Sequence, residues 1–127
     1  MGLKEELKQQ NQKEPYQPTK EDISYWFNLI NRTIFLGELT PFSKITIKRM
    51  NRIWAAVVYD DEIKNCSLEL HFNIKMPDKR FFIEVLAHEM VHKWQMEINI
   101  DSGNHNKHFF SWRDAYAEYG LILTRTM

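Results

Sequence analysis

The sequence has a single cysteine, Cys66, among its 127 residues. A disulfide within the chain is therefore impossible, and a zinc ribbon, which needs several cysteine thiolates, is excluded. A lone thiol fits a reducing compartment. We interpret Cys66, which stands in a strand-like stretch, as a small apolar residue without a chemical role.

The chain also lacks a net charge and a long apolar run. Seventeen Lys and Arg residues balance seventeen Asp and Glu residues, so the overall charge indicates neither nucleic acid nor an anionic membrane as an obligatory partner. The N-terminal stretch MGLKEELKQQNQKEPYQPTK contains no apolar segment that could serve as a signal peptide or span a bilayer. We therefore expect a cytoplasmic protein, in the host cytoplasm if the source is viral, with no membrane partner.

Residues 1–18 are rich in Gln, Lys, Glu and Asn and carry two of the four prolines. This composition is typical of a flexible or partly helical polar tail. Hydrophobic residues make up 43% of the whole chain, which is enough for one modest core. We therefore expect a polar tail over residues 1–18 and a single domain over residues 19–127.

The patterns within this domain predict an α+β fold. Thr19 is a suitable helix cap, apolar residues follow it at helical spacing, and Gly37 is a suitable stop. Three segments within residues 44–73 are apolar or alternate with period two, which favours a small three-stranded antiparallel sheet. Helical spacing returns after residue 78 and again over residues 107–120, which predicts two further helices.

The stretch AHEMVH, residues 87–92, carries the strongest chemical signal. His88 and His92 lie four residues apart, so a helix places their imidazoles on one face, one turn apart. Such a pair can bind one zinc ion, with Glu89 beside it. Zinc lowers the pKa of a bound water and polarises a carbonyl group, while a neighbouring carboxylate can take the proton and pass it to a leaving amine. The motif predicts hydrolysis of peptide bonds.

Two histidines on one helix face can also be hydrogen-bonded core residues. Together with Phe81 and Val85, the two histidines form one stripe at helical spacing, on the side of the helix that normally faces the core. Burial of two imidazoles there costs desolvation free energy unless a partner satisfies them. A shared metal ion does so, and we therefore favour a metal site over a pair of core histidines.

A catalytic zinc ion usually has three protein ligands and an open position for water. Gln95 and Ile98 stand where a metzincin has a glycine and its third histidine, so that class is excluded. Four residues that follow the motif are candidates for the third ligand: His105, His108, Glu118 and, more weakly, Asp101. Use of Glu118 would give a site with two histidines and a glutamate.

Residues 105–109, HNKHF, complete a pattern that resembles the SprT-like family of zinc metallopeptidases. In that family a third histidine follows the HExxH helix and opens an H-G-x-x-[FW] pattern that leads into another helix. His105 and Phe109 match this pattern, whereas Asn106 stands at the position of the glycine. The resemblance covers residues 19–123.

The resemblance implies a zincin-like minimal metalloprotease domain. It implies one zinc ion on His88, His92 and His105, Glu89 as the general base, and a flexible or unfolded polypeptide as the substrate. The zinc ribbon that follows this domain in bacterial SprT proteins is missing from the sequence. A short domain of this kind is similar to versions found in bacteriophages.

A catalytically silent zinc-binding module is the alternative from another class, for example a phage accessory or virion protein with a structural or interaction role. The presence of Glu89 argues against it, because a purely structural site needs only metal ligands.

Four basic residues surround the first expected strand and precede Trp54: Lys44, Lys48, Arg49 and Arg52. Basic side chains with an aromatic neighbour can bind single-stranded nucleic acid through phosphate contacts and base stacking. Spartan-type relatives of SprT cut proteins crosslinked to DNA, so the resemblance adds a DNA-associated protease as a further alternative. A solvated strand edge protected by lysines explains the same residues, and the zero net charge favours that interpretation.

Overall fold

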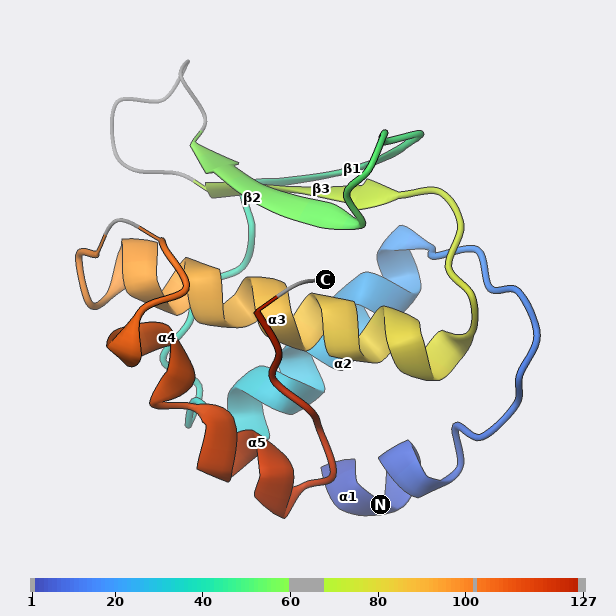
Figure 1. Ribbon diagram of the computed structural model, residues 1–127, viewed down its shortest axis with the longest axis horizontal. Helices are drawn as coiled ribbons and strands as arrows, with labels where there is room; N and C mark the ends of the chain where they lie inside the picture. The colour runs from blue at the N-terminus through green and yellow to red at the C-terminus, as the bar shows by residue number, and fades with distance from the viewer. Residues whose placement is uncertain (1, 60–67, 102, 126–127) are drawn as a thin grey trace.

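A three-stranded sheet lies over one side of the long helix α3, and the other helices surround that helix (Figure 1). The computed structural model describes residues 2–59, 68–101 and 103–125. The elements in chain order are α1 (Leu3–Lys8), α2 (Lys20–Thr33), β1 (Lys44–Lys48), β2 (Ala55–Tyr59), β3 (Leu68–Asn73), α3 (Lys79–Glu97), α4 (Lys107–Phe110) and α5 (Arg113–Glu118). The expected α+β class is confirmed. Cys66 lies outside the described residues.

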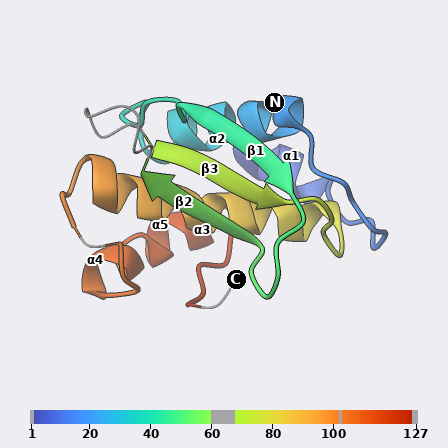
Figure 2. The ribbon, with the colours of Figure 1, turned by 90° about the horizontal axis from the view of Figure 1, so that it is seen from above.

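The sheet has the strand order β1-β3-β2, so β3 is central and the other two strands are edges (Figure 2). β2 runs antiparallel to β3, as expected, but β1 runs parallel to it, so the sheet is mixed. The alternation of side chains predicts a strand without predicting its neighbours, which explains the difference. Leu68, Leu70 and Phe72 alternate along β3 and are buried, as the period-two pattern predicts.

The two long helices begin where the sequence predicts. Thr19 Oγ1 accepts a hydrogen bond from the backbone N–H of Asp22 at 3.1 Å at the start of α2. Asp78 caps α3 in the same way, by accepting from the N–H of Phe81 at 2.8 Å. Each cap satisfies a backbone donor that the helix itself leaves unpaired. None of the described helices is apolar enough over a sufficient length to cross a bilayer.

The C-terminal stretch forms two short helices, α4 and α5, instead of the one helix expected over residues 107–120. The break falls at Ser111, whose hydroxyl donates to the backbone carbonyl of His108 at 2.6 Å. A hydroxyl that bonds to a carbonyl of the preceding turn competes with the helical ladder, which helps to explain the interruption. Gly120 follows α5 with a φ of +88°, a conformation that ends a helix readily without a side chain.

Helix α1, within the segment expected as a flexible polar tail, packs against the domain. Leu3 and Leu7, one turn apart in α1, are buried in the core. The guanidinium of Arg80, in the first turn of α3, donates to the backbone carbonyl of Leu7 at 3.0 Å and also to that of Gly120. Two leucines in a polar stretch are a weak signal in the sequence, because their burial depends on partners far along the chain.

Candidate metal centre

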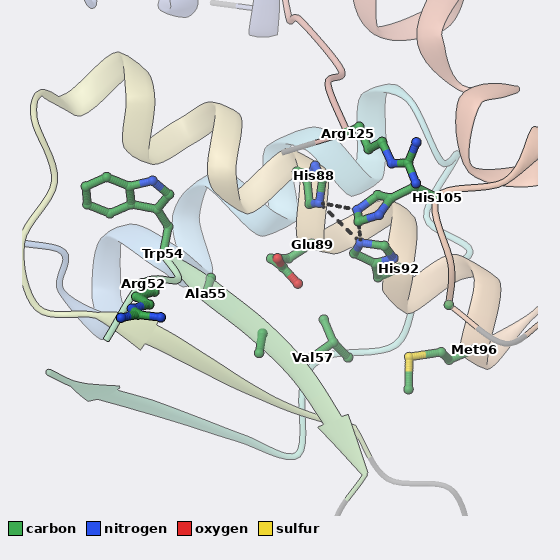
Figure 3. Close-up of a pocket in the computed structure, with 12 residues that line it drawn as sticks. Arg52, Trp54, Ala55, Val57, His88, Glu89, His92, Met96, His105 and Arg125 are labelled. Carbon is green, nitrogen blue, oxygen red and sulfur yellow. Dashed lines mark hydrogen bonds between the residues drawn. The ribbon is translucent and has the colours of Figure 1, made fainter. Parts of the chain in front are cut away.

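Helix α3 brings two imidazoles together on one of its faces (Figure 3). The Nε2 atoms of His88 and His92 lie 3.2 Å apart. The buried ring of Phe109, from α4, packs against both imidazoles, with ring centres 4.9 Å from that of His88 and 4.8 Å from that of His92. This contact supports the two rings in an orientation in which their Nε2 atoms face the same space.

The third imidazole comes from the loop between α3 and α4. His105 Nε2 lies 3.2 Å from Nε2 of His88 and 3.2 Å from Nε2 of His92. The three nitrogen atoms therefore form a triangle with equal sides, drawn as dashed lines in Figure 3. A tetrahedral zinc ion with Zn–N distances of about 2.0–2.1 Å holds its nitrogen ligands about 3.3 Å apart. The triangle fits such an ion.

The other three candidates for the third ligand do not join this triangle. His108 is exposed on α4, and Glu118 is exposed on α5. Asp101 is half-buried, and its carboxylate accepts hydrogen bonds from two amide side chains. Within the part of the chain that the structure describes, the three imidazoles are the group that could hold a metal ion.

The environment of the imidazoles favours their neutral form. The pKa of His88 is lowered to about 3, first by burial and then by the two imidazole neighbours. Burial also lowers the pKa values of His92 and His105, and for His105 the positive charge of Arg125 adds to the decrease. A neutral imidazole keeps a lone pair on one ring nitrogen, and this is the form that binds a transition metal.

A hydrogen bond to Gln95 determines which nitrogen of His92 carries the hydrogen. His92 Nδ1 lies 3.0 Å from Oε1 of Gln95, while the amide nitrogen of Gln95 faces oxygen acceptors. Oε1 must therefore accept, so Nδ1 donates and Nε2 presents its lone pair to the triangle. The sequence did not predict this hydrogen bond, although a spacing of three residues on a helix puts both side chains on one face.

Glu89 extends from α3 toward strand β2, beside the three imidazoles (Figure 3). The residue is only 4% exposed. Burial raises the pKa of its carboxyl group to about 8, and a backbone hydrogen bond at Val57 opposes this increase. A cation held by the imidazoles would lower this pKa by charge attraction. A carboxyl group whose pKa lies near the working pH is suited to proton transfer.

A cavity of about 600 Å³ contains the three imidazoles and Glu89 and lies between β2 and α3. Strand β2, from Ala55 to Val57, forms one wall, and Arg52 and Arg125 add two exposed guanidinium groups (Figure 3). Of the basic cluster noted in the sequence, only Arg52 lines this cavity. Lys44 and Lys48 are exposed at the two ends of β1, on the opposite edge of the sheet.

Comparison with known proteins identifies the family of the chain. No curated protein and no solved structure gives a match. The description of a known protein family, the SprT-like family, matches residues 23–126, a range that includes the sheet, the long helix α3 and the three histidines. The chain therefore belongs to the SprT-like family.

Proposed function

We propose that the chain is a zinc-dependent metallopeptidase, with His88, His92 and His105 as zinc ligands and Glu89 as the general base. The observation that carries this proposal is the triangle of Nε2 atoms, 3.2 Å on each side, with a carboxyl group in the same cavity. A structural zinc site is usually closed by four protein ligands, whereas the described residues offer three here. Three ligands leave a position for water or substrate.

Zinc, when bound, supplies a Lewis acid that lowers the pKa of water and polarises a carbonyl group. The protein itself contributes proton transfer, through Glu89. Its carboxylate takes a proton from the attacking water and passes it to the amine of the cleaved bond. Burial supports this role, because a desolvated carboxylate is a stronger base than one in water.

The cavity wall supports an extended polypeptide as the substrate. β2 pairs with β3 on one side only, and as an edge strand it leaves backbone groups on its other side, although the one at Val57 bonds to Glu89. A flexible or unfolded segment could add to this edge by backbone hydrogen bonds, a mode of binding that does not depend on particular side chains.

The variant Glu89→Gln tests the proposal, because the amide keeps the shape of the side chain and removes its basicity. We expect the zinc content of the parent and a loss of roughly 10²- to 10⁴-fold in the cleavage of a denatured protein. His105→Ala is the matched comparison, which should lose zinc as well as activity. Equal cleavage by the parent and Glu89→Gln would contradict the assigned base.

The same assay separates a protease from a catalytically silent zinc-binding module. A parent chain that binds one zinc ion and cleaves no denatured polypeptide would favour the silent module. Cleavage that stops with a chelator and returns with added zinc would favour the enzyme.

A contact with single-stranded nucleic acid is a second candidate function. The observation that favours it is the position of Arg52 and Trp54, a basic and an aromatic side chain that line the same cavity as the imidazoles. We expect Arg52→Glu to weaken the binding of a fluorescent single strand, whereas Lys44→Glu/Lys48→Glu, on the opposite edge of the sheet, should leave it nearly unchanged. Binding that does not weaken with added salt would exclude the basic cluster as its cause.

A further inference from the structure

The side chain of Gln95 connects two of the three histidines through its amide group. Gln95 is completely buried, at 0% exposure. Its Oε1 accepts the hydrogen bond from Nδ1 of His92 at 3.0 Å. Its Nε2 donates to the backbone carbonyl of Asn104 at 2.8 Å and to Oδ1 of Asn106 at 3.2 Å. One amide thus contacts a histidine of α3 and both chain neighbours of His105.

The loop between α3 and α4 closes on this same amide. The carboxylate of Asp101 accepts from Gln95 Nε2 at 3.2 Å, and the backbone N–H of Asp101 donates to the backbone carbonyl of Gln95 at 2.7 Å. Asn106 Nδ2 donates to both carboxylate oxygens of Asp101, at 3.0 and 3.3 Å. Asn106 Oδ1 also caps α4, by accepting from the N–H groups of His108 and Phe109. These hydrogen bonds hold the residues on both sides of His105.

We propose that Gln95 is a positioning residue of the metal centre, which fixes the tautomer of His92 and holds His105 within reach of the other two imidazoles. It acts through these two ligands and does not contact the metal. The inference rests on the proposed function only in that zinc is the ion on the triangle, and it does not require that the chain cleaves anything.

An amide is the side chain that meets both requirements at this position. It accepts one hydrogen bond and donates others, whereas a carboxylate has no donor for the carbonyl of Asn104 and an ammonium group has no acceptor for His92. Buried partners that lose their hydrogen bonds reorganise or carry a desolvation cost. Methionine has nearly the length of glutamine and makes neither bond, so Gln95→Met removes the network with little change in volume.

The first measurement is zinc affinity, by competition with a chromogenic chelator on the full chain. We expect Gln95→Met to weaken zinc binding by roughly 10- to 100-fold, the usual effect of losing a group that orients a metal ligand. Asn31→Leu is the matched control. Asn31 is another buried amide, which accepts from the N–H of Leu39 at 3.1 Å and donates to its carbonyl at 2.9 Å, away from the cavity. This control should lose stability and keep the zinc affinity of the parent.

A double-variant cycle separates positioning from general damage. In the His105→Ala background the loop no longer delivers a ligand, so Gln95→Met should cost clearly less zinc affinity than in the parent. Cobalt(II) in place of zinc gives a visible absorption spectrum that reports its coordination. Gln95→Met should shift this spectrum toward that of His105→Ala, which a purely structural role would not do.

The variant Asp101→Ala keeps the test decisive if Gln95→Met does not fold. It removes a half-buried acceptor of the network, and we expect a smaller loss of zinc affinity with cooperative unfolding retained. Unchanged zinc affinity in both variants, or full additivity in the double-variant cycle, would overturn the proposal. A parent that binds zinc without proteolysis overturns only the proposed function, and a parent that binds no zinc overturns both.

Discussion

Helix α3 buries two polar clusters, and they differ in how their charges are balanced. The first surrounds Lys93, which is 2% exposed. Its ammonium group lies 3.0 Å from Oε2 of Glu97, in an ion pair, and 3.4 Å from the hydroxyl of Thr40. The ring of Phe42 lies beneath it at 5.0 Å. Burial lowers the pKa of Lys93, and Glu97 opposes that decrease. In this cluster the charge of the buried lysine is paired with a carboxylate of the same helix.

The second cluster, which comprises Glu89 and the three imidazoles, contains no such balance. The imidazoles share pKa values lowered by burial, and Glu89 has a pKa raised by burial. Among the residues described, no basic side chain forms an ion pair with Glu89. Buried polar groups without a counter-charge weaken a fold unless a ligand satisfies them. The Lys93 cluster therefore balances its charge within the chain, whereas the histidine cluster could hold a cation.

Loss of one imidazole should give the largest effect, a loss of zinc affinity that a variant in the Lys93 cluster does not share. We expect His92→Ala to lower zinc affinity by roughly three orders of magnitude, because a site with two ligands remains. Lys93→Met, one residue further along the same helix, should bind zinc as the parent does. Competition with a chelator measures both. Similar losses in the two variants would mean that the clusters are not independent.

The raised pKa of the Glu89 carboxyl group should make the stability of the metal-free chain depend on pH. The folded, metal-free chain holds the pKa of Glu89 at about 8, above the ordinary value of 4.5. Between these values the unfolded chain ionises while the folded chain keeps its proton, so Glu89 lowers stability as the pH rises. We expect Glu89→Gln to gain about 2 kcal/mol relative to the parent between pH 5.5 and 7.5.

Denaturant unfolding of both metal-free chains at the two pH values measures this difference. The three histidines are common to both chains, so their own titration cancels in the comparison. A difference that stays constant with pH would show that Glu89 is ionised in the folded chain. Added zinc should reduce the pH dependence, since a cation favours the carboxylate.

Removal of the balancing charge in the first cluster should give the smallest of the three effects. Lys93→Met leaves the Glu97 carboxylate without its ion pair, although Glu97 still accepts from the backbone N–H of Thr40 at 2.9 Å. We expect a loss of about 1–2 kcal/mol in the free energy of unfolding. The double variant Lys93→Met/Glu97→Gln should recover part of it. No recovery would show that packing of the lysine chain, rather than its charge, matters.

The features that local chemistry determines could be predicted from the sequence. Thr19 caps its helix because a hydroxyl three residues before a free N–H is sufficient for that bond. The alternation of Leu68, Leu70 and Phe72 likewise requires only that one face of the strand meets the core. The spacing of His88 and His92 on one helix is a local property of the same kind.

The features that the sequence did not predict depend on contacts between distant residues. The parallel pairing of β1 with β3 depends on contacts between segments that are far apart in the sequence, and so does the burial of Leu3 and Leu7. A local pattern does not predict such contacts. The role of Gln95 is hidden for a related reason. Its partners on the far side of the loop, Asp101 and Asn106, become visible only once the loop is folded.

The cap at Asn106 has a consequence for the recognition of relatives by sequence. Its φ of −105° lies in the ordinary extended region, so the backbone at this position does not require glycine. A short polar side chain can occupy it and start the following helix, as Asn106 does here. A search pattern that insists on glycine directly after the third histidine would therefore reject chains that build the same loop. A pattern that accepts either glycine or a capping residue describes what the backbone permits.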